Sequence, residues 1–191
     1  IPTNVISITD GQIFLESSLL FEGMRPAVNV GLSVSRVGGA AQTKAMKKAA
    51  GSVRIDLAQY REMEVFTQFS SDLDPATKAQ LAYGSGLMEL LKQPLEHPLS
   101  MEEQVVILYA ATSPLLVDIP KEKLKTFQGG LYEYMRSSYP KVGDALRTTK
   151  TLSEDIQREI AKAVGEYKAK FLKAQGNALE AATADAKLDK Q

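Results

Sequence analysis

One arginine of this chain, Arg36, follows a predicted β-strand directly and is suited to binding phosphate. Apolar side chains alternate with small or polar ones just before it, at Val28, Val30, Leu32 and Val34. This period of two predicts a half-buried strand over Val28–Ser35, and Gly38 with Gly39 then predicts a turn. Ligands gather at the carboxyl ends of strands in open α/β sheets. A planar, always charged guanidinium at that position is a candidate phosphate ligand, and the alternative from composition is an ordinary exposed arginine.

The composition argues against several classes of function. The 23 Lys and Arg residues balance the 23 Asp and Glu residues, so no net field attracts nucleic acid or an acidic membrane. The chain has no cysteine, which excludes thiol catalysis, a disulfide framework and a zinc–thiolate site. Its apolar runs are far shorter than the roughly 18 residues that span a bilayer. We therefore expect no nucleic-acid partner and no direct insertion into a membrane.

The secondary-structure pattern changes near Gln42. Strand-like runs come before it, separated by residues typical of turns, at Val5–Ile8, Gln12–Leu15 and Val28–Ser35. After it, apolar residues recur at steps of three and four. The first such stripe predicts one helix face, formed by Val53, Leu57, Tyr60, Met63, Phe66 and Phe69.

Capping residues predict where the later helices begin and end. Start signals stand at Asp74-Pro75, at the capping box Ser100-x-x-Glu103, at Pro120 and at Ser153–Asp155. End signals stand at Ser113-Pro114 and at Tyr139-Pro140. With the stripe after Gln42, these signals predict five to seven helices.

Two blocks of sequence resemble the α subunits of F-type rotary ATP synthases. Residues 1–15 read IPTNVISITDGQIFL and residues 31–42 read GLSVSRVGGAAQ, and the family carries closely similar signatures in the same order. The order of motifs follows that family from Ile1 to about Phe171. The resemblance implies a mainly α fold, in which a carboxyl-terminal bundle of about five to seven helices follows a few strands left over from an α/β nucleotide-binding domain.

The resemblance also implies three regions. Residues 1–42 are expected to be the last strands of an incomplete nucleotide-binding domain, residues 43–172 an α-helical carboxyl-terminal domain, and residues 173–191 a frayed or disordered tail. The sequence contains no G-x-x-x-x-G-K-[ST] phosphate loop, so we expect a carboxyl-terminal part of a larger subunit. The early strands belong in a parallel sheet, and alone we expect them to be partly disordered, rearranged or packed on a neighbouring copy.

Three residues are implied to serve a catalytic ATP site at a subunit interface. Arg36 is implied to be an arginine finger, delivered to a site held mainly by a neighbouring β subunit, where it stabilises charge on the transferring phosphoryl group. Ser33 and Ser7 are implied to belong to the same interface. For both serines a structural alternative stays open, because Ser33 is small enough for close strand packing and Ser7 is suited to bonding backbone within a buried strand.

A second, non-catalytic nucleotide site is implied within the subunit itself. Arg25 and Pro26 with Gln93 are implied to hold the adenine. The family carries a second glutamine where this chain has Leu95, and the effect on base selectivity stays open. We expect ATP or ADP with Mg²⁺ in the intact complex and none bound to the chain alone. His97, the single histidine, is expected to be a solvent-facing loop residue, and we expect no metal site.

The implied function is that of the carboxyl-terminal part of a non-catalytic, regulatory α subunit of the proton-translocating ATP synthase. Its implied partners are the β subunits, the central-stalk γ subunit and the peripheral stalk. The implied location is peripheral, on the cytoplasmic side of the bacterial inner membrane or the equivalent organelle matrix side. The complex would be the enzyme, and the chain alone would not. Two alternatives stay open: a related hexameric nucleoside-triphosphate motor, and a helical protein-interaction domain without nucleotide chemistry.

Overall fold

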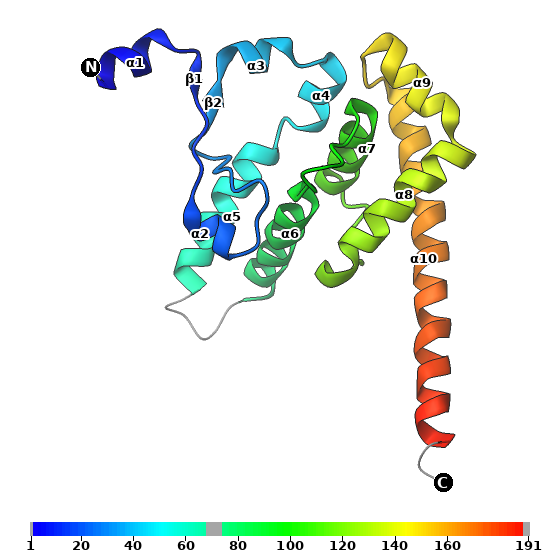
Figure 1. Ribbon diagram of the computed structural model, residues 1–191. Helices are drawn as coiled ribbons and strands as arrows, with labels where there is room; N and C mark the ends of the chain where they lie inside the picture. Colours follow the sequence, from blue (N-terminus) through cyan, green and yellow to red (C-terminus); the bar gives the residue numbers. More distant parts are fainter. Residues whose placement is uncertain (1, 68–73, 189–191) are drawn as a thin grey trace.

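The computed structural model describes residues 2–67 and 74–188. It shows a body of packed helices with a long final helix and a smaller amino-terminal segment at one side (Figure 1). The mainly α fold with a few short strands is confirmed. The boundaries expected at residues 42 and 172 stay predictions.

The helical body contains α4 to α10 among the described residues. Their bounds are α4 (Lys44–Ala49), α5 (Val53–Thr67), α6 (Pro75–Leu91), α7 (Met101–Thr112), α8 (Leu124–Ser138), α9 (Pro140–Thr149) and α10 (Glu154–Leu188), with a 3₁₀ turn η1 (Lys121–Lys123) before α8. Helix α6 packs against α5 and α8, while α7 packs against α4, α9 and α10. The lower part of α10 extends away from the other helices (Figure 1).

The core of this body lies where α7, α8, α9 and α10 meet. The side chains there are almost completely excluded from solvent: Val105 on α7, Phe127 and Leu131 on α8, Val142 and Leu146 on α9, and Ile160 and Val164 on α10. The Phe127 ring lies edge-on to Phe171, with ring centroids 5.3 Å apart. Burial of this apolar surface holds the four helices together.

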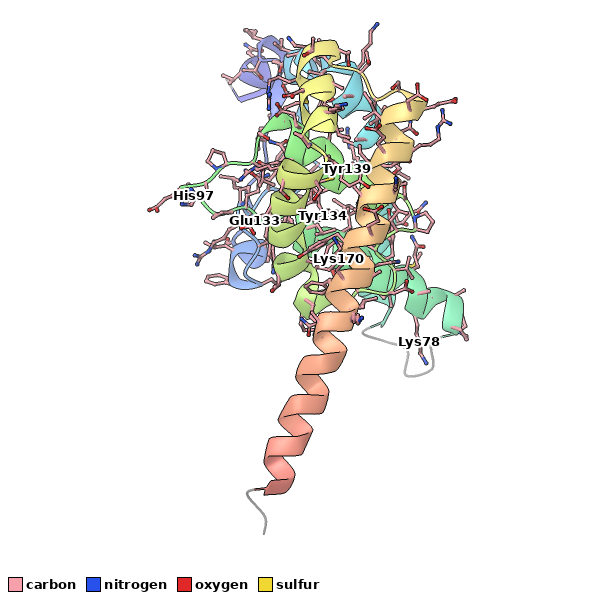
Figure 2. All side chains as sticks on the ribbon, turned by 90° about the vertical axis from the view of Figure 1, so that its right-hand side faces the viewer. Lys78, His97, Glu133, Tyr134, Tyr139 and Lys170 are labelled. Carbon is pink, nitrogen blue, oxygen red and sulfur yellow. The ribbon has the colours of Figure 1, made fainter. Side chains whose placement is uncertain are left out.

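A set of tyrosines adds polar contacts between α8 and α10. Tyr134 and Tyr139 each donate a hydroxyl hydrogen bond to the Glu166 carboxylate, both at 2.8 Å. The Lys170 ammonium lies 4.4 Å from the centre of the Tyr134 ring. Tyr134, Tyr139 and Lys170 lie along the face shared by the two helices (Figure 2).

The predicted helix starts are confirmed where the sequence carries a cap. Asp74 accepts a hydrogen bond from the Thr77 amide at 2.9 Å and caps α6. Ser100 and Glu103 form the predicted capping box of α7, with the Glu103 carboxylate 2.9 Å from the Ser100 amide. Ser153 precedes α10 as predicted and accepts from the Ile156 amide at 3.4 Å.

Two features of the helical body differ from the prediction. The helix expected from Pro120 begins as the 3₁₀ turn η1, and its α-helical part starts at Leu124. Helix α9 was not predicted, because Pro140 was interpreted only as the end of α8. Pro140 also occupies the first turn of α9, where proline is well tolerated. In the first apolar stripe, the Phe66 side chain and all of Phe69 lie outside the described residues.

The amino-terminal segment contains α1 (Pro2–Ile8), β1 (Gly11–Gln12), α2 (Ser17–Phe21), β2 (Val34–Ser35) and α3 (Arg36–Ala41). Strands β1 and β2 pair antiparallel, with Gly11 opposite Ser35 and Gln12 opposite Val34. An isolated antiparallel bridge joins Leu15 to Val28. The described part of the segment therefore forms a small antiparallel ladder, which is one of the arrangements expected for these strands alone, namely a rearranged one.

Most of the strand predictions for this segment are wrong. Val5–Ile8 belongs to helix α1, Gln12–Leu15 pairs only at its two ends, and Val28–Ser35 contains a turn at residues 30–32. The turn predicted at Gly38 and Gly39 is replaced by helix α3.

The physical reason for these differences is the supply of hydrogen-bond partners. A strand needs neighbours to satisfy its amides and carbonyls, and the described segment offers only one two-residue pairing and one isolated bridge. The amides of Leu32 and Ser33 therefore bond locally to Asn29, whose side chain and backbone carbonyls accept at 3.0 Å each. Such local bonds compete directly with extended structure.

The close approach of α5 and α6 yields a stability prediction. A Cβ at buried Gly84 on α6 would lie 2.4 Å from ring atoms of Tyr60 on α5. We expect Gly84→Ala to destabilise the chain by about 1–3 kcal/mol, because the two helices must separate to relieve the overlap. The measurement is the midpoint of urea-induced unfolding.

The matched control is Gly129→Ala on α8, where a Cβ would meet no atom within 4 Å. This change should leave stability unaltered or raise it by up to about 1 kcal/mol, because alanine favours the helix. Equal midpoints for the two variants would contradict the packing described here.

Candidate functional site

The Arg36 side chain is exposed, but hydrogen bonds to two backbone carbonyls fix its position. Its Nε donates to the Asp10 carbonyl at 3.1 Å, and its Nη2 donates to the Thr9 carbonyl at 3.0 Å. Arg36 is the first residue of α3 and directly follows strand β2. The strand that was expected to present this arginine is thus only two residues long, yet Arg36 still stands at its carboxyl end.

The Asp10 carboxylate anchors the backbone around Arg36. One carboxylate oxygen accepts from the Ser35 hydroxyl at 2.5 Å and the other from the Val37 amide at 2.5 Å. The hydrogen bond from Ser35, followed by that from Val37, holds the pKa of the Asp10 carboxyl below its ordinary value. Asp10 therefore carries a negative charge at neutral pH and stabilises the first turn of α3.

Gly11 allows the two sides of this site to approach closely. Its φ is +152°, and a Cβ at this position would lie 2.0 Å from the Val34 carbonyl oxygen. Only a residue without a side chain fits such a contact. Asp10 and Gly11 lie among the residues typical of turns that separate the first two strand-like runs. The sequence does not predict their role in holding Arg36, because no local pattern links residues 10 and 36.

Ser33 is half-buried and joins two backbone segments. Its hydroxyl donates to the Asn29 carbonyl at 2.6 Å and accepts from the Phe14 amide at 3.0 Å. Ser33 thus ties the turn before β2 to the chain after β1, close in sequence to Arg36. Ser7 lies in helix α1, and its side chain is outside the described part of the structure.

The three residues implied to hold adenine lie together. The Gln93 amide donates to the Arg25 carbonyl at 2.8 Å, and the Arg25–Pro26 peptide is cis. Arg25 and Pro26 are exposed, and Gln93 is partly buried at the end of α6. The structure thus joins an amino-terminal loop to the helical body at this point.

The residues that follow Gln93 form an exposed loop. Leu95 stands where the family carries a second glutamine, and its side chain is 98% exposed. It therefore lies in solvent and does not pack into the helical body. His97 is exposed as expected and lies at the edge of the molecule (Figure 2). Within the described residues, no group of His, Cys, Asp and Glu side chains is arranged to hold a metal ion.

The amino-terminal segment exposes a large amount of apolar surface. Large apolar side chains with high exposure include Ile8, Leu15, Phe21 and Val37, which are 83%, 71%, 86% and 68% exposed. This many exposed apolar side chains on one short segment favour contact with another protein surface. Arg36 and its carbonyl partners lie within this apolar segment. Of the helices in the described ranges, none is long and apolar enough to cross a bilayer.

Comparison with protein families gives two matches, which are separated by residues 36–41. Residues 42–167 match the family model described as ATP synthase alpha/beta chain, C terminal domain. Residues 1–35 match the model described as ATP synthase alpha/beta family, nucleotide-binding domain. The first match covers helices α4 to α9 and the first part of α10. The second covers the amino-terminal segment up to the residue before Arg36.

The Asp10 contacts predict a pH-dependent change at α3. Because the folded-state pKa is lowered, the contribution of Asp10 is fully present above its ordinary pKa of about 3.9 and is lost as the pH falls through the lower folded value. We expect the Val37 amide resonance to move in an NMR titration below about pH 4, as its carboxylate partner is protonated. In Asp10→Asn that acid titration step should be absent, and a retained step would show that another group governs the Val37 amide.

Proposed function

The chain belongs to the ATP synthase alpha/beta family, and on this premise we propose that it forms the carboxyl-terminal part of a non-catalytic α subunit in an F-type rotary ATP synthase. Family membership means that the chain is a subunit of an oligomeric rotary ATPase. The assignment to the α subunit is supported by the blocks IPTNVISITDGQIFL and GLSVSRVGGAAQ. A helical interaction domain without nucleotide chemistry is disfavoured by the family membership, and a related hexameric motor is disfavoured by those two blocks.

The observation that carries the proposal is the fixed yet exposed guanidinium of Arg36. Two of its nitrogens are bound to the carbonyls of Thr9 and Asp10, so the group loses little further freedom on meeting a ligand. The group lies within an apolar segment suited to contact with a neighbouring subunit.

In the assembled complex, Arg36 acts as an arginine finger at the neighbouring β subunit's ATP site. Phosphoryl transfer needs positive charge placed against the transferring phosphate oxygens, and a guanidinium from a neighbour supplies it. Ser33 supports this role by holding the turn that precedes β2. Ser7 is proposed for the same interface on the strength of the sequence resemblance alone.

A second nucleotide, ATP or ADP with Mg²⁺, binds the subunit's own non-catalytic site. Arg25, Pro26 and Gln93 would hold its adenine, and their chemistry fits a base. The Gln93 side-chain amide both donates and accepts, the Pro26 ring offers an apolar face, and the guanidinium of exposed Arg25 stacks well on planar groups. The nucleotide supplies no bond-breaking step at this site.

The helical body is proposed to surround the central-stalk γ subunit, with β subunits beside it and the peripheral stalk elsewhere in the complex. The exposed apolar side chains of residues 1–41 are covered in that assembly. Proton transport belongs to the complex, which is held at the cytoplasmic side of the bacterial membrane or at the equivalent organelle matrix side. The subunit is peripheral to that membrane.

The finger role is tested by Arg36→Lys in the assembled complex. We expect ATP turnover to fall by a factor on the order of 10³ or more, because a point charge cannot replace the planar fork. Nucleotide binding should remain close to wild type, measured by equilibrium binding beside steady-state hydrolysis.

The matched control is Arg54→Lys, since Arg54 also donates to a backbone carbonyl of the amino-terminal segment, that of Gly31 at 2.9 Å. This variant should keep a turnover within about twofold of wild type, because Arg54 is assigned only a structural contact. Wild-type turnover in Arg36→Lys would contradict the proposed role of Arg36 as an arginine finger.

A further inference from the structure

A single peptide unit links helix α8 to the loop that carries Arg25. The carbonyl of Lys92 and the amide of Gln93 belong to the same peptide bond. The amide donates to the Arg25 carbonyl at 2.8 Å, while the carbonyl accepts from the Lys125 ammonium. Lys125 lies in the first turn of α8, far from both partners in the sequence. The peptide is therefore held from both sides.

The Lys125 ammonium is itself held by a partly buried polar chain. It donates to the Gln128 side-chain carbonyl at 2.9 Å, and the Gln128 amide donates to the Tyr132 hydroxyl at 2.7 Å. Gln128 is 4% exposed, so its orientation is fixed by these contacts. The ammonium that meets the Lys92 carbonyl is consequently presented by the core of α8 rather than by a free surface side chain.

The neighbouring Lys92 ammonium does not donate to the Lys92 carbonyl among the described contacts. The Lys92 ammonium pairs with the Glu89 carboxylate at 2.7 Å on the last turn of α6. Lys125 alone of these groups donates to that carbonyl among the described contacts. A charged donor on a peptide carbonyl also strengthens the hydrogen bond that the amide of the same peptide donates.

We propose that Lys125 is a positioning residue for base recognition at the non-catalytic nucleotide site. This inference rests on the proposed function, in which Arg25, Pro26 and Gln93 hold the adenine. By fixing the Lys92–Gln93 peptide, Lys125 sets both the origin of the Gln93 side chain and the position of the Arg25 backbone. Helix α8 packs against α6 and α10. A shift of α8 would move Lys125 and with it the Lys92–Gln93 peptide, so the position of the helical body affects how the site binds the base.

The test uses the assembled complex and a photoreactive 2-azido-adenine nucleotide. Crosslinking of this chain reports occupancy near the base, and competition by MgATP and by magnesium tripolyphosphate reports the affinities with and without a base. In Lys125→Met we expect about tenfold weaker competition by MgATP, the loss of one charged hydrogen bond. Competition by tripolyphosphate should stay unchanged.

Two further variants separate positioning from structural loss. Lys125→Arg keeps a charged donor and should restore MgATP competition to within about twofold of wild type. Lys168→Met removes a lysine of α10 that pairs with Asp118 instead, and it should behave as wild type. Unchanged MgATP competition in Lys125→Met, or an equal loss for MgATP and tripolyphosphate, would overturn the positioning role.

Gln93→Ala distinguishes this inference from the function on which it rests. If Gln93→Ala weakens MgATP competition and Lys125→Met does not, the adenine site stands and the role of Lys125 fails. If Gln93→Ala also competes as wild type, or if the wild-type chain is not labelled at all, the proposed adenine site fails and the inference fails with it.

Discussion

The Asp10 carboxylate provides the constraint on which the Arg36 site depends. It binds the Ser35 hydroxyl and the Val37 amide with its two oxygens, so the residues on both sides of Arg36 are held to the same group. The Arg36 side chain then returns to the carbonyls of Thr9 and Asp10. An exposed arginine usually samples many rotamers at an entropic cost to any contact it makes. Here the hydrogen bonds among Thr9, Asp10 and residues 35–37 already restrict the rotamers of Arg36.

Several contacts join the amino-terminal segment to the helical body. The Arg54 guanidinium reaches the Gly31 carbonyl, the Gln93 amide reaches the Arg25 carbonyl, and Val30 packs against the core. The body itself is stabilised by burial between α7, α8, α9 and α10. A segment with extensive exposed apolar surface is thus attached to a well-packed body, an arrangement suited to a subunit that completes its packing in an assembly.

Local signals in the sequence predicted the helical body well, because a cap needs only residues three positions apart. The caps at Asp74 and Ser100 are confirmed for this reason. Alternation over Val28–Ser35 failed as a strand signal, since a strand depends on partners that local sequence does not specify. The resemblance named Arg25 and Gln93 as one adenine site, which stays a prediction; a backbone hydrogen bond joins the two residues. The anchoring role of Asp10 was not predictable, because its contacts join distant parts of the chain.

The central claim is that Arg36 reaches the nucleotide of a neighbouring subunit. A structure of the assembled complex with MgADP and an aluminium fluoride mimic of the transferring phosphate tests this most directly. The account predicts a guanidinium nitrogen of Arg36 at about 2.7–3.2 Å from the mimic bound by the neighbour. An Arg36 side chain directed into bulk solvent, away from every bound nucleotide, would contradict it.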